Sequence, residues 1–174
     1  MKGLLFDSNS SENRARRDLV HDRCRAYTRS PSKGHFKKLK TLFNKCGNDV
    51  RIEYGFHCDY GNKISFGEGV YLNINCTILD GGDVIIGDDV LIGPNVQFIT
   101  VNHEIQASAR LHKKAYVQSI KIGNKVWIGA GVIILPGAII EDNVVVGAGS
   151  IVTGLLKSNR LYTGNPAQLN KEIE

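Results

Sequence analysis

Residues 120–150 read IKIGNK VWIGAG VIILPG AIIEDN VVVGAG S, a pattern that returns every six positions. A small or branched apolar residue opens each group of six, and glycine often stands three places later, where it relieves a tight turn. An α-helix repeats every 3.6 residues and a strand every two, so neither element alone gives this period. A solenoid with three six-residue faces per turn does give it, because each group then forms one short strand and one turn.

The same period extends towards the N-terminus. It covers residues 52–76, slips by two positions and resumes over 84–96, which makes fourteen groups of six in all. We therefore predict a mainly β fold, a parallel β-helix over residues 51–154 with four to five turns, each packed only on its neighbours. The residues expected to open the groups and to point into a triangular core are Ile52, Cys58, Ile64, Val70, Cys76, Val84, Val90, Val96, Ile120, Val126, Val132, Ala138, Val144 and Ser150.

Composition places the chain among ordinary globular proteins. Its 174 residues are 42% hydrophobic and 22% charged, which suits one domain with a sizeable core. The longest apolar run, residues 126–140, is broken by three glycines and a proline and is too short to cross a bilayer. The N-terminus lacks the apolar core of a signal peptide, so a cytoplasmic location is expected.

The four cysteines have no Cys-x-x-Cys pair, so a structural zinc site is not expected. We predict reduced and buried thiols. Cys58 and Cys76 are 18 residues apart, which is one full turn of the predicted coil, and are expected to stack about 4.8 Å apart.

Basic residues concentrate in the first fifty positions, which hold 12 Lys or Arg and 5 Asp or Glu. This segment has no aromatic platform for bases and no recognition-helix signature, so nucleic-acid binding is not expected. The pattern favours a solvated helix surface, with an anionic partner as the alternative.

Residues 1–50 are predicted to form two short helices that pack on the coil. Asn9 is placed to cap the first helix, with Glu12 in the capping-box position, and Gly47 is placed to end the second. Residues 155–174 are expected to form a C-terminal tail. The apolar faces are assigned to Ala15, Leu19, Val20, Cys24 and Tyr27, and to Phe36, Leu39, Leu42 and Phe43.

The period fails between Val96 and Ile120. We expect a loop at about residues 99–118 that protrudes from the coil without regular structure of its own, a feature that is typical of functional loops. His103 lies near its beginning, where the backbone is still fixed by the coil. From the residues alone it is either a general base or an ordinary surface histidine.

The ordered set of motifs resembles the maltose and galactoside O-acetyltransferases, trimeric enzymes with a left-handed β-helix of hexapeptide repeats. The resemblance covers nearly the whole chain, and its combination of a loop histidine followed by a single tryptophan is specific. It is carried by Phe56–Gly61, Asn73–Asp80, Ile86–Asp88, Gly93–Val96, Thr100 with His103, Ile122–Gly129, Pro136–Gly137, Val146–Thr153 and Gly164–Ala167.

The resemblance implies a homotrimer with active sites between subunits. His103 would remove a proton from an acceptor hydroxyl, which would attack acetyl-CoA directly, with no metal and no acyl-enzyme. The backbone amide of Ala130 would stabilise the oxyanion. Asp59 and Asn73 would bind the acceptor, although a turn residue is the alternative for Asp59 and a left-handed turn residue for Asn73. Trp127 would border the acetyl channel, or would serve packing alone.

Gly129, Ala130, Ala148 and Thr153 match positions that line the coenzyme A groove, where small side chains are also what tight coil turns need. The chain departs from the family in four places. Glu104 replaces a proline after the histidine, Gly81 replaces the second residue of an Asp-Asp pair, and Gly154 and Gln168 replace basic residues. The loss of the two basic residues puts the contacts with the coenzyme A phosphates in doubt, and Lys157, Arg160 or Lys171 are the candidates to replace them.

Three other functions remain open at this point. One is a non-catalytic trimeric scaffold or binding protein that retains the coil, and another is a xenobiotic acetyltransferase with the same fold. The third is a zinc enzyme of the carbonic anhydrase kind. It would need three converging imidazoles, for which His57, His103 and His112 are the candidates.

Overall fold

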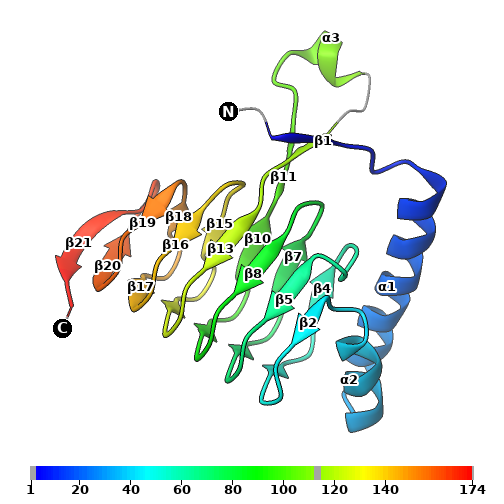
Figure 1. The fold of residues 1–174 in the computed structure, drawn as a ribbon, viewed down its shortest axis with the longest axis horizontal. Helices are drawn as coiled ribbons and strands as arrows, with labels where there is room; N and C mark the ends of the chain where they lie inside the picture. The colour runs from blue at the N-terminus through cyan, green and yellow to red at the C-terminus, as the bar shows by residue number, and fades with distance from the viewer. Residues whose placement is uncertain (1–2, 112–114, 174) are drawn as a thin grey trace.

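The computed structural model describes residues 3–111 and 115–173. It is a left-handed parallel β-helix with two helices packed at its N-terminal end, as predicted (Figure 1). The chain visits three sheets in a fixed order, and we name them by their number of strands. The six-strand sheet holds β2 (Lys45–Cys46), β5 (Ile64–Phe66), β8 (Val84–Ile86), β13 (Ile120–Ile122), β16 (Ile139–Ile140) and β19 (Leu155–Leu156).

The other two sheets complete the triangular cross-section. Strands of the coil occur before residue 51 and after residue 154, so the coil is longer than the predicted range 51–154. The described chain completes five turns of the coil before the C-terminal strands. The seven-strand sheet holds β3 (Arg51–Ile52), β6 (Tyr71–Leu72), β9 (Leu91–Ile92), β14 (Trp127–Ile128), β17 (Val144–Val146), β20 (Arg160–Thr163) and the antiparallel β21 (Gln168–Glu172). The five-strand sheet holds β4 (His57–Cys58), β7 (Thr77–Leu79), β10 (Gln97–Ile99), β15 (Ile133–Ile134) and β18 (Ile151–Val152).

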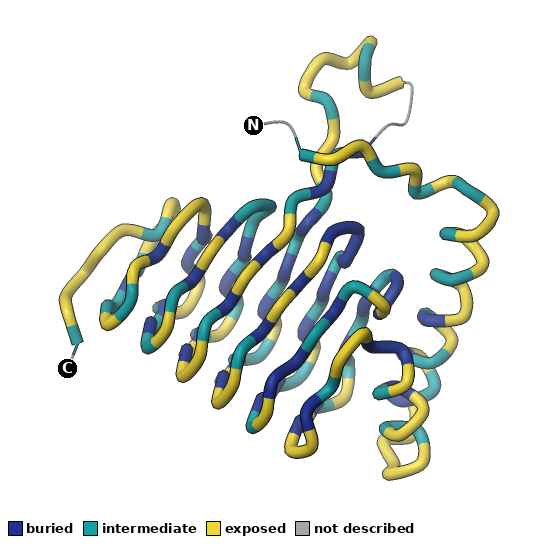
Figure 2. The backbone as a smooth tube through the Cα atoms, viewed as in Figure 1, coloured by how far each residue is buried: buried dark blue, intermediate teal, exposed yellow. Residues whose placement is uncertain are grey.

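From Ile64 onward, each group of six buries two residues in the core. In the first turn the inward pairs are Val50 with Ile52 and Phe56 with Cys58, so these groups open two places before the predicted Ile52 and Cys58. The residue that opens the group and the residue two places later both face inward, as Val126 and Ile128 illustrate, while Trp127 between them points outward. Buried positions therefore recur along every turn of the coil (Figure 2). Burial of these apolar side chains is the main contribution to the stability of the fold.

The predicted stacking of Cys58 on Cys76 is wrong. Cys58 pairs with Ile78 instead, because the first turns contain 20 residues rather than 18. The two extra residues lie in longer turns between the five-strand and six-strand sheets, and they explain the slip in the period. All four cysteines are free thiols, and Cys46 is half-buried where burial was predicted.

Two helices cover the N-terminal end of the coil. They are α1 (Ser11–Arg29) and α2 (Lys33–Lys40). The start of α1 and the end of α2 differ from the predicted residues. The cap of α1 is Ser10 rather than Asn9, since the Ser10 hydroxyl accepts a hydrogen bond from the Asn13 amide at 3.2 Å. The α2 helix ends before Gly47, which pairs with the coil through the Phe66 carbonyl. The buried face of α1 is narrower than expected and excludes Ala15 and Leu19.

The cap assignment predicts a measurable difference between two neighbouring residues. Ser10→Ala should lower the free energy of unfolding by about 1 kcal/mol, because it removes the only side-chain oxygen that caps α1 in the described chain. Asn9→Ala should change it by less than about 0.5 kcal/mol. Urea unfolding of both variants tests the assignment, which equal effects would refute.

The protruding segment has regular structure, contrary to expectation. It contains β11 (Val101–His103), α3 (Ala107–Arg110) and β12 (Ala115–Val117). β12 pairs antiparallel with β11 on one side and with β1 (Leu4–Phe6) on the other, so the start of the chain crosses the base of this hairpin (Figure 1). Within the described ranges, no helix is long and apolar enough to span a bilayer.

Candidate active site

The positions of the predicted site residues follow from the two edges of the five-strand sheet. The leading edge is formed by the turns that connect the seven-strand sheet to the five-strand sheet. The trailing edge is formed by the turns that connect the five-strand sheet to the six-strand sheet. His103, Asp59 and Thr153 follow strands β10, β4 and β18 on the trailing edge. A second group, made of Asn73, Gly129, Ala130 and Ala148, follows strands of the seven-strand sheet on the leading edge.

His103 ends β11, where the hairpin leaves the coil. Its backbone is fixed opposite Ala115 of β12, and its side chain is exposed. The histidine therefore combines a held backbone with free access to solvent, which a proton-transfer group requires. It lines a cavity of about 170 Å³ together with Gly3, Asn102, Glu104, Ile105, Tyr116 and Gln118.

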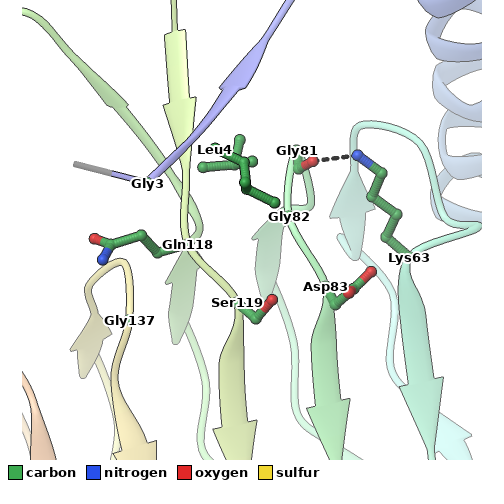
Figure 3. A pocket seen from close by; sticks show the side chains of 10 residues that line it. Gly3, Leu4, Lys63, Gly81, Gly82, Asp83, Gln118, Ser119 and Gly137 are labelled. Atoms are coloured by element: carbon green, nitrogen blue, oxygen red, sulfur yellow. Dashed lines mark hydrogen bonds between the residues drawn. The ribbon is translucent and has the colours of Figure 1, made fainter. Parts of the chain in front are cut away.

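A larger cavity of about 540 Å³ lies beside the first, on the same edge of the coil (Figure 3). Gly3 and Gln118 line both cavities, so the two are adjacent. Gly81 and Gly82 form part of its wall, and the Lys63 ammonium donates a hydrogen bond to the Gly81 carbonyl. Gly81 is one of the departures from the family pattern, and an aspartate there would place a carboxylate in this wall.

Asp59 lies in a turn that a buried carboxylate holds in place. The oxygens of Asp80 accept hydrogen bonds from the amides of Asp59 and Tyr60 at 2.9 Å and from that of Gly61 at 2.6 Å. Burial raises the pKa of the Asp80 carboxyl, and the three backbone donors act in the opposite direction. Asp80 was not singled out as a site residue from the sequence, although it ends the Asn73–Asp80 motif.

The Asp59 side chain meets two imidazoles. Its Oδ1 atom lies 3.4 Å from Nε2 of His21 on α1, and the ring of His21 lies 4.5 Å from that of His57 on β4. Burial and the neighbouring His21 lower the pKa of His57. The backbone of Asp59 lies in a turn, as its alternative role requires. Its side chain, however, faces other polar groups instead of solvent alone.

Asn73 is half-buried at the leading edge. Its Oδ1 accepts a hydrogen bond from the Ile74 amide at 2.8 Å, and its own amide donates to the Ile92 carbonyl at 2.9 Å. The alternative role of Asn73 was that of a turn residue with a left-handed conformation. That conformation occurs at Asn75 instead, whose φ is 59°. The side-chain amide nitrogen of Asn73 is thus the group left to meet a ligand.

Gly129, Ala130 and Ala148 lie where consecutive turns of the coil approach closely. A Cβ atom at position 129 would lie 2.6 Å from the Ala148 nitrogen, so the coil itself requires this glycine. Ala130 and Ala148 are exposed. The Ala130 carbonyl accepts from Gly149, while its N–H has no partner among the described residues.

Trp127 is 57% exposed on the outer face of the seven-strand sheet, beside Leu91 of the preceding turn. Packing within the core of its own chain is therefore not its role. An exposed tryptophan in line with an exposed leucine is typical of a surface that meets a ligand or another chain.

Comparison with known proteins assigns the family. The family described as "Bacterial transferase hexapeptide (six repeats)" matches residues 119–154. The galactoside O-acetyltransferase of Escherichia coli K12 is 41% identical over 78% of this chain and 66% of its own length. The crystal structure of a maltose O-acetyltransferase from Clostridium difficile 630 superposes with a TM-score of 0.95 at 36% identity, over 99% of this chain and 94% of that one.

The chain belongs to the galactoside and maltose O-acetyltransferase family. A further similar structure, a hexapeptide-repeat acetyltransferase of Vibrio cholerae O1 biovar eltor, has been solved in complex with acetyl-CoA. It is 31% identical, with a TM-score of 0.91 over 97% of this chain and 93% of that one.

One departure from the family pattern, Gly154, has a local structural cause in this O-acetyltransferase. Gly154 adopts a φ of 75°, a left-handed conformation that favours glycine over the usual lysine. Arg160 forms an ion pair with Glu172 at 3.1 Å, whereas Lys157 and Lys171 are exposed. The two lysines are thus the better candidates to replace the missing phosphate contacts.

Within one chain, the predicted site residues are not all brought together. His103 lies on the trailing edge, and Asn73, Ala130 and Ala148 lie on the leading edge, with the five-strand sheet between them. The zinc alternative of the carbonic anhydrase kind requires imidazoles that converge across a subunit interface. Within one chain His57 lies on β4 and His103 on the hairpin, and His112 lies outside the described residues.

Proposed function

We propose that this acetyltransferase transfers the acetyl group of acetyl-CoA to a hydroxyl group of a sugar or sugar-like acceptor, with His103 as the general base. The observation that carries the proposal is the exposed imidazole of His103, held on a paired strand at the rim of a cavity. An acceptor bound there would place its hydroxyl within reach of a neutral imidazole nitrogen.

The reaction needs one base and one oxyanion donor. His103 takes the proton as the acceptor oxygen bonds to the thioester carbon, which gives a tetrahedral oxyanion. The oxyanion collapses, the C–S bond breaks, and the imidazolium returns its proton to the sulfur of coenzyme A. The Ala130 amide is the proposed oxyanion donor, since its N–H has no partner among the described residues.

A homotrimer would complete the site. Two different faces of the prism carry exposed apolar residues, namely Ile85, Ile139 and Leu155 on the six-strand sheet and Leu91 and Trp127 on the seven-strand sheet. When two unlike faces meet between copies, the contact is heterologous, and a threefold rotation closes it into a ring. In such a ring the trailing edge of one subunit lies against the leading edge of the next, which brings His103 to Ala130.

Each ligand is proposed to contact residues from both edges. Asp59 and Asn73 are proposed to bind acceptor hydroxyls, because carboxylate and amide groups match groups that both donate and accept. Gly129, Ala130, Ala148 and Thr153 are proposed to line the coenzyme A groove, where the exposed positions of the last three leave room for the pantetheine arm. Trp127 would border the acetyl channel.

Thiol release from acetyl-CoA tests the proposal against a panel of sugars, glycosides and amino alcohols, with mass spectrometry of the products. Release that depends on a sugar and yields an O-acetyl product supports it. Transfer only to a non-sugar drug-like alcohol would favour a xenobiotic acetyltransferase. Failure of the protein to bind either acetyl-CoA or coenzyme A would favour a scaffold and refute the proposal.

A further inference from the structure

We infer that His21, His57 and Asp59 form a binding site for a divalent transition-metal cation, with Zn²⁺ as the best match. The family relationship assigns no such role, and the sequence predicted no metal. The site shares Asp59 with the proposed acceptor site, but the inference concerns metal binding and does not depend on acetyl transfer.

The three side chains present the donor atoms that Zn²⁺ prefers. One nitrogen from each imidazole and one carboxylate oxygen all lie within 4.8 Å of one another. A tetrahedral zinc ion, with bonds of about 2.0–2.2 Å, holds its ligand atoms roughly 3.3 Å apart. The His21 Nε2 and Asp59 Oδ1 atoms are already 3.4 Å apart, so a small rotation of His57 would complete the set.

Rigid elements hold all three ligands. His21 lies on α1 between Val20 and Cys24, both of which are buried. His57 belongs to β4, whose neighbour in the sheet is β7. Asp59 is fixed by the bonds from its turn to Asp80. The backbones of the three ligands are thus held in place before any ion arrives, which limits the conformational entropy lost on binding.

The site is also accessible and suitably charged. All three residues are half-buried, and a cavity of about 220 Å³ lined by His57 and Cys24 opens beside them. Arg25 also lines this cavity, but its charge is offset by an ion pair with Asp22. Two imidazoles and one carboxylate leave a fourth position for water, as in open zinc sites, and the same donors would accept Ni²⁺ or Cu²⁺.

The test is calorimetric titration of ZnCl₂ into the full-length protein after treatment with a chelator. We expect one Zn²⁺ per chain in the wild type. His21→Gln and Asp59→Asn should each raise the dissociation constant at least about tenfold, since each removes a ligand atom. His35→Gln is the matched control, because His35 lies on α2 with its Nδ1 atom 2.7 Å from the Ser30 carbonyl oxygen.

Cobalt substitution supplies an independent readout. The wild type loaded with Co²⁺ should show the visible absorption of a tetrahedral site, and His21→Gln should lose it while its circular dichroism stays unchanged. The proposal is overturned if the wild type does not bind Zn²⁺. It is equally overturned if His21→Gln binds as tightly as the wild type, or if His35→Gln alone weakens binding.

Discussion

His103→Ala should reduce kcat for acetyl transfer by about 10²–10⁴-fold, the usual contribution of a positioned general base. The imidazole is exposed, and the contacts of β11 with β12 are made by the backbone, so the variant should fold as the wild type does. The Michaelis constant for acetyl-CoA should change little, because the histidine contributes to the chemical step more than to cofactor binding.

The measurement is steady-state thiol release with the best acceptor from the panel. Ser108→Ala is the control, since Ser108 lies exposed on α3 of the same hairpin. If the rate of His103→Ala falls within about threefold of the wild-type rate, general-base catalysis by this residue is excluded.

Asp80→Ala should lower the free energy of unfolding by about 3–5 kcal/mol. The substitution leaves three backbone N–H groups, those of residues 59–61, without their carboxyl acceptor in a buried turn, and an unsatisfied buried donor costs about 1–3 kcal/mol. Water entering the space left by the side chain recovers only part of this loss. For a chain of this length the melting temperature should fall by about 10 °C.

Asp83→Ala provides the matched control for thermal unfolding, because Asp83 is exposed in the same turn region. It should change the free energy of unfolding by less than about 0.5 kcal/mol. Equal stability of the two variants would contradict the view that Asp80 holds the turn that carries Asp59.

The coil could be predicted from the sequence because its interactions repeat. Each turn of the solenoid packs only on its neighbours, so six-residue spacing alone specifies which side chains point inward. The register of the first turns was mispredicted, since Cys58 pairs with Ile78 and the two extra residues lie in a turn that the period does not describe. The start of α1 was missed by one residue because Asn9 and Ser10 are both good cap residues.

The hairpin could not be predicted from its own sequence. Its structure depends on β1, about 100 residues away, pairing with β12, and no local pattern signals a contact at that separation. The break in the period did indicate where the chain leaves the coil, and the proposed base His103 lies at the start of that segment. The cluster at Asp59 was not found, because His21 is 38 residues distant and reaches it only through the docking of α1.

The most direct test of a site shared between subunits is complementation by mixed trimers. His103→Ala and Ala148→Trp should each be inactive alone, the first without its base and the second with its cofactor groove filled by a large side chain at an exposed position. Co-refolded in equal amounts, they should regain about one quarter of the wild-type activity, because one interface in four combines an intact trailing edge with an intact leading edge. If trimers that contain both chains remain inactive, His103 and Ala148 do not act across a subunit interface, and the account is contradicted.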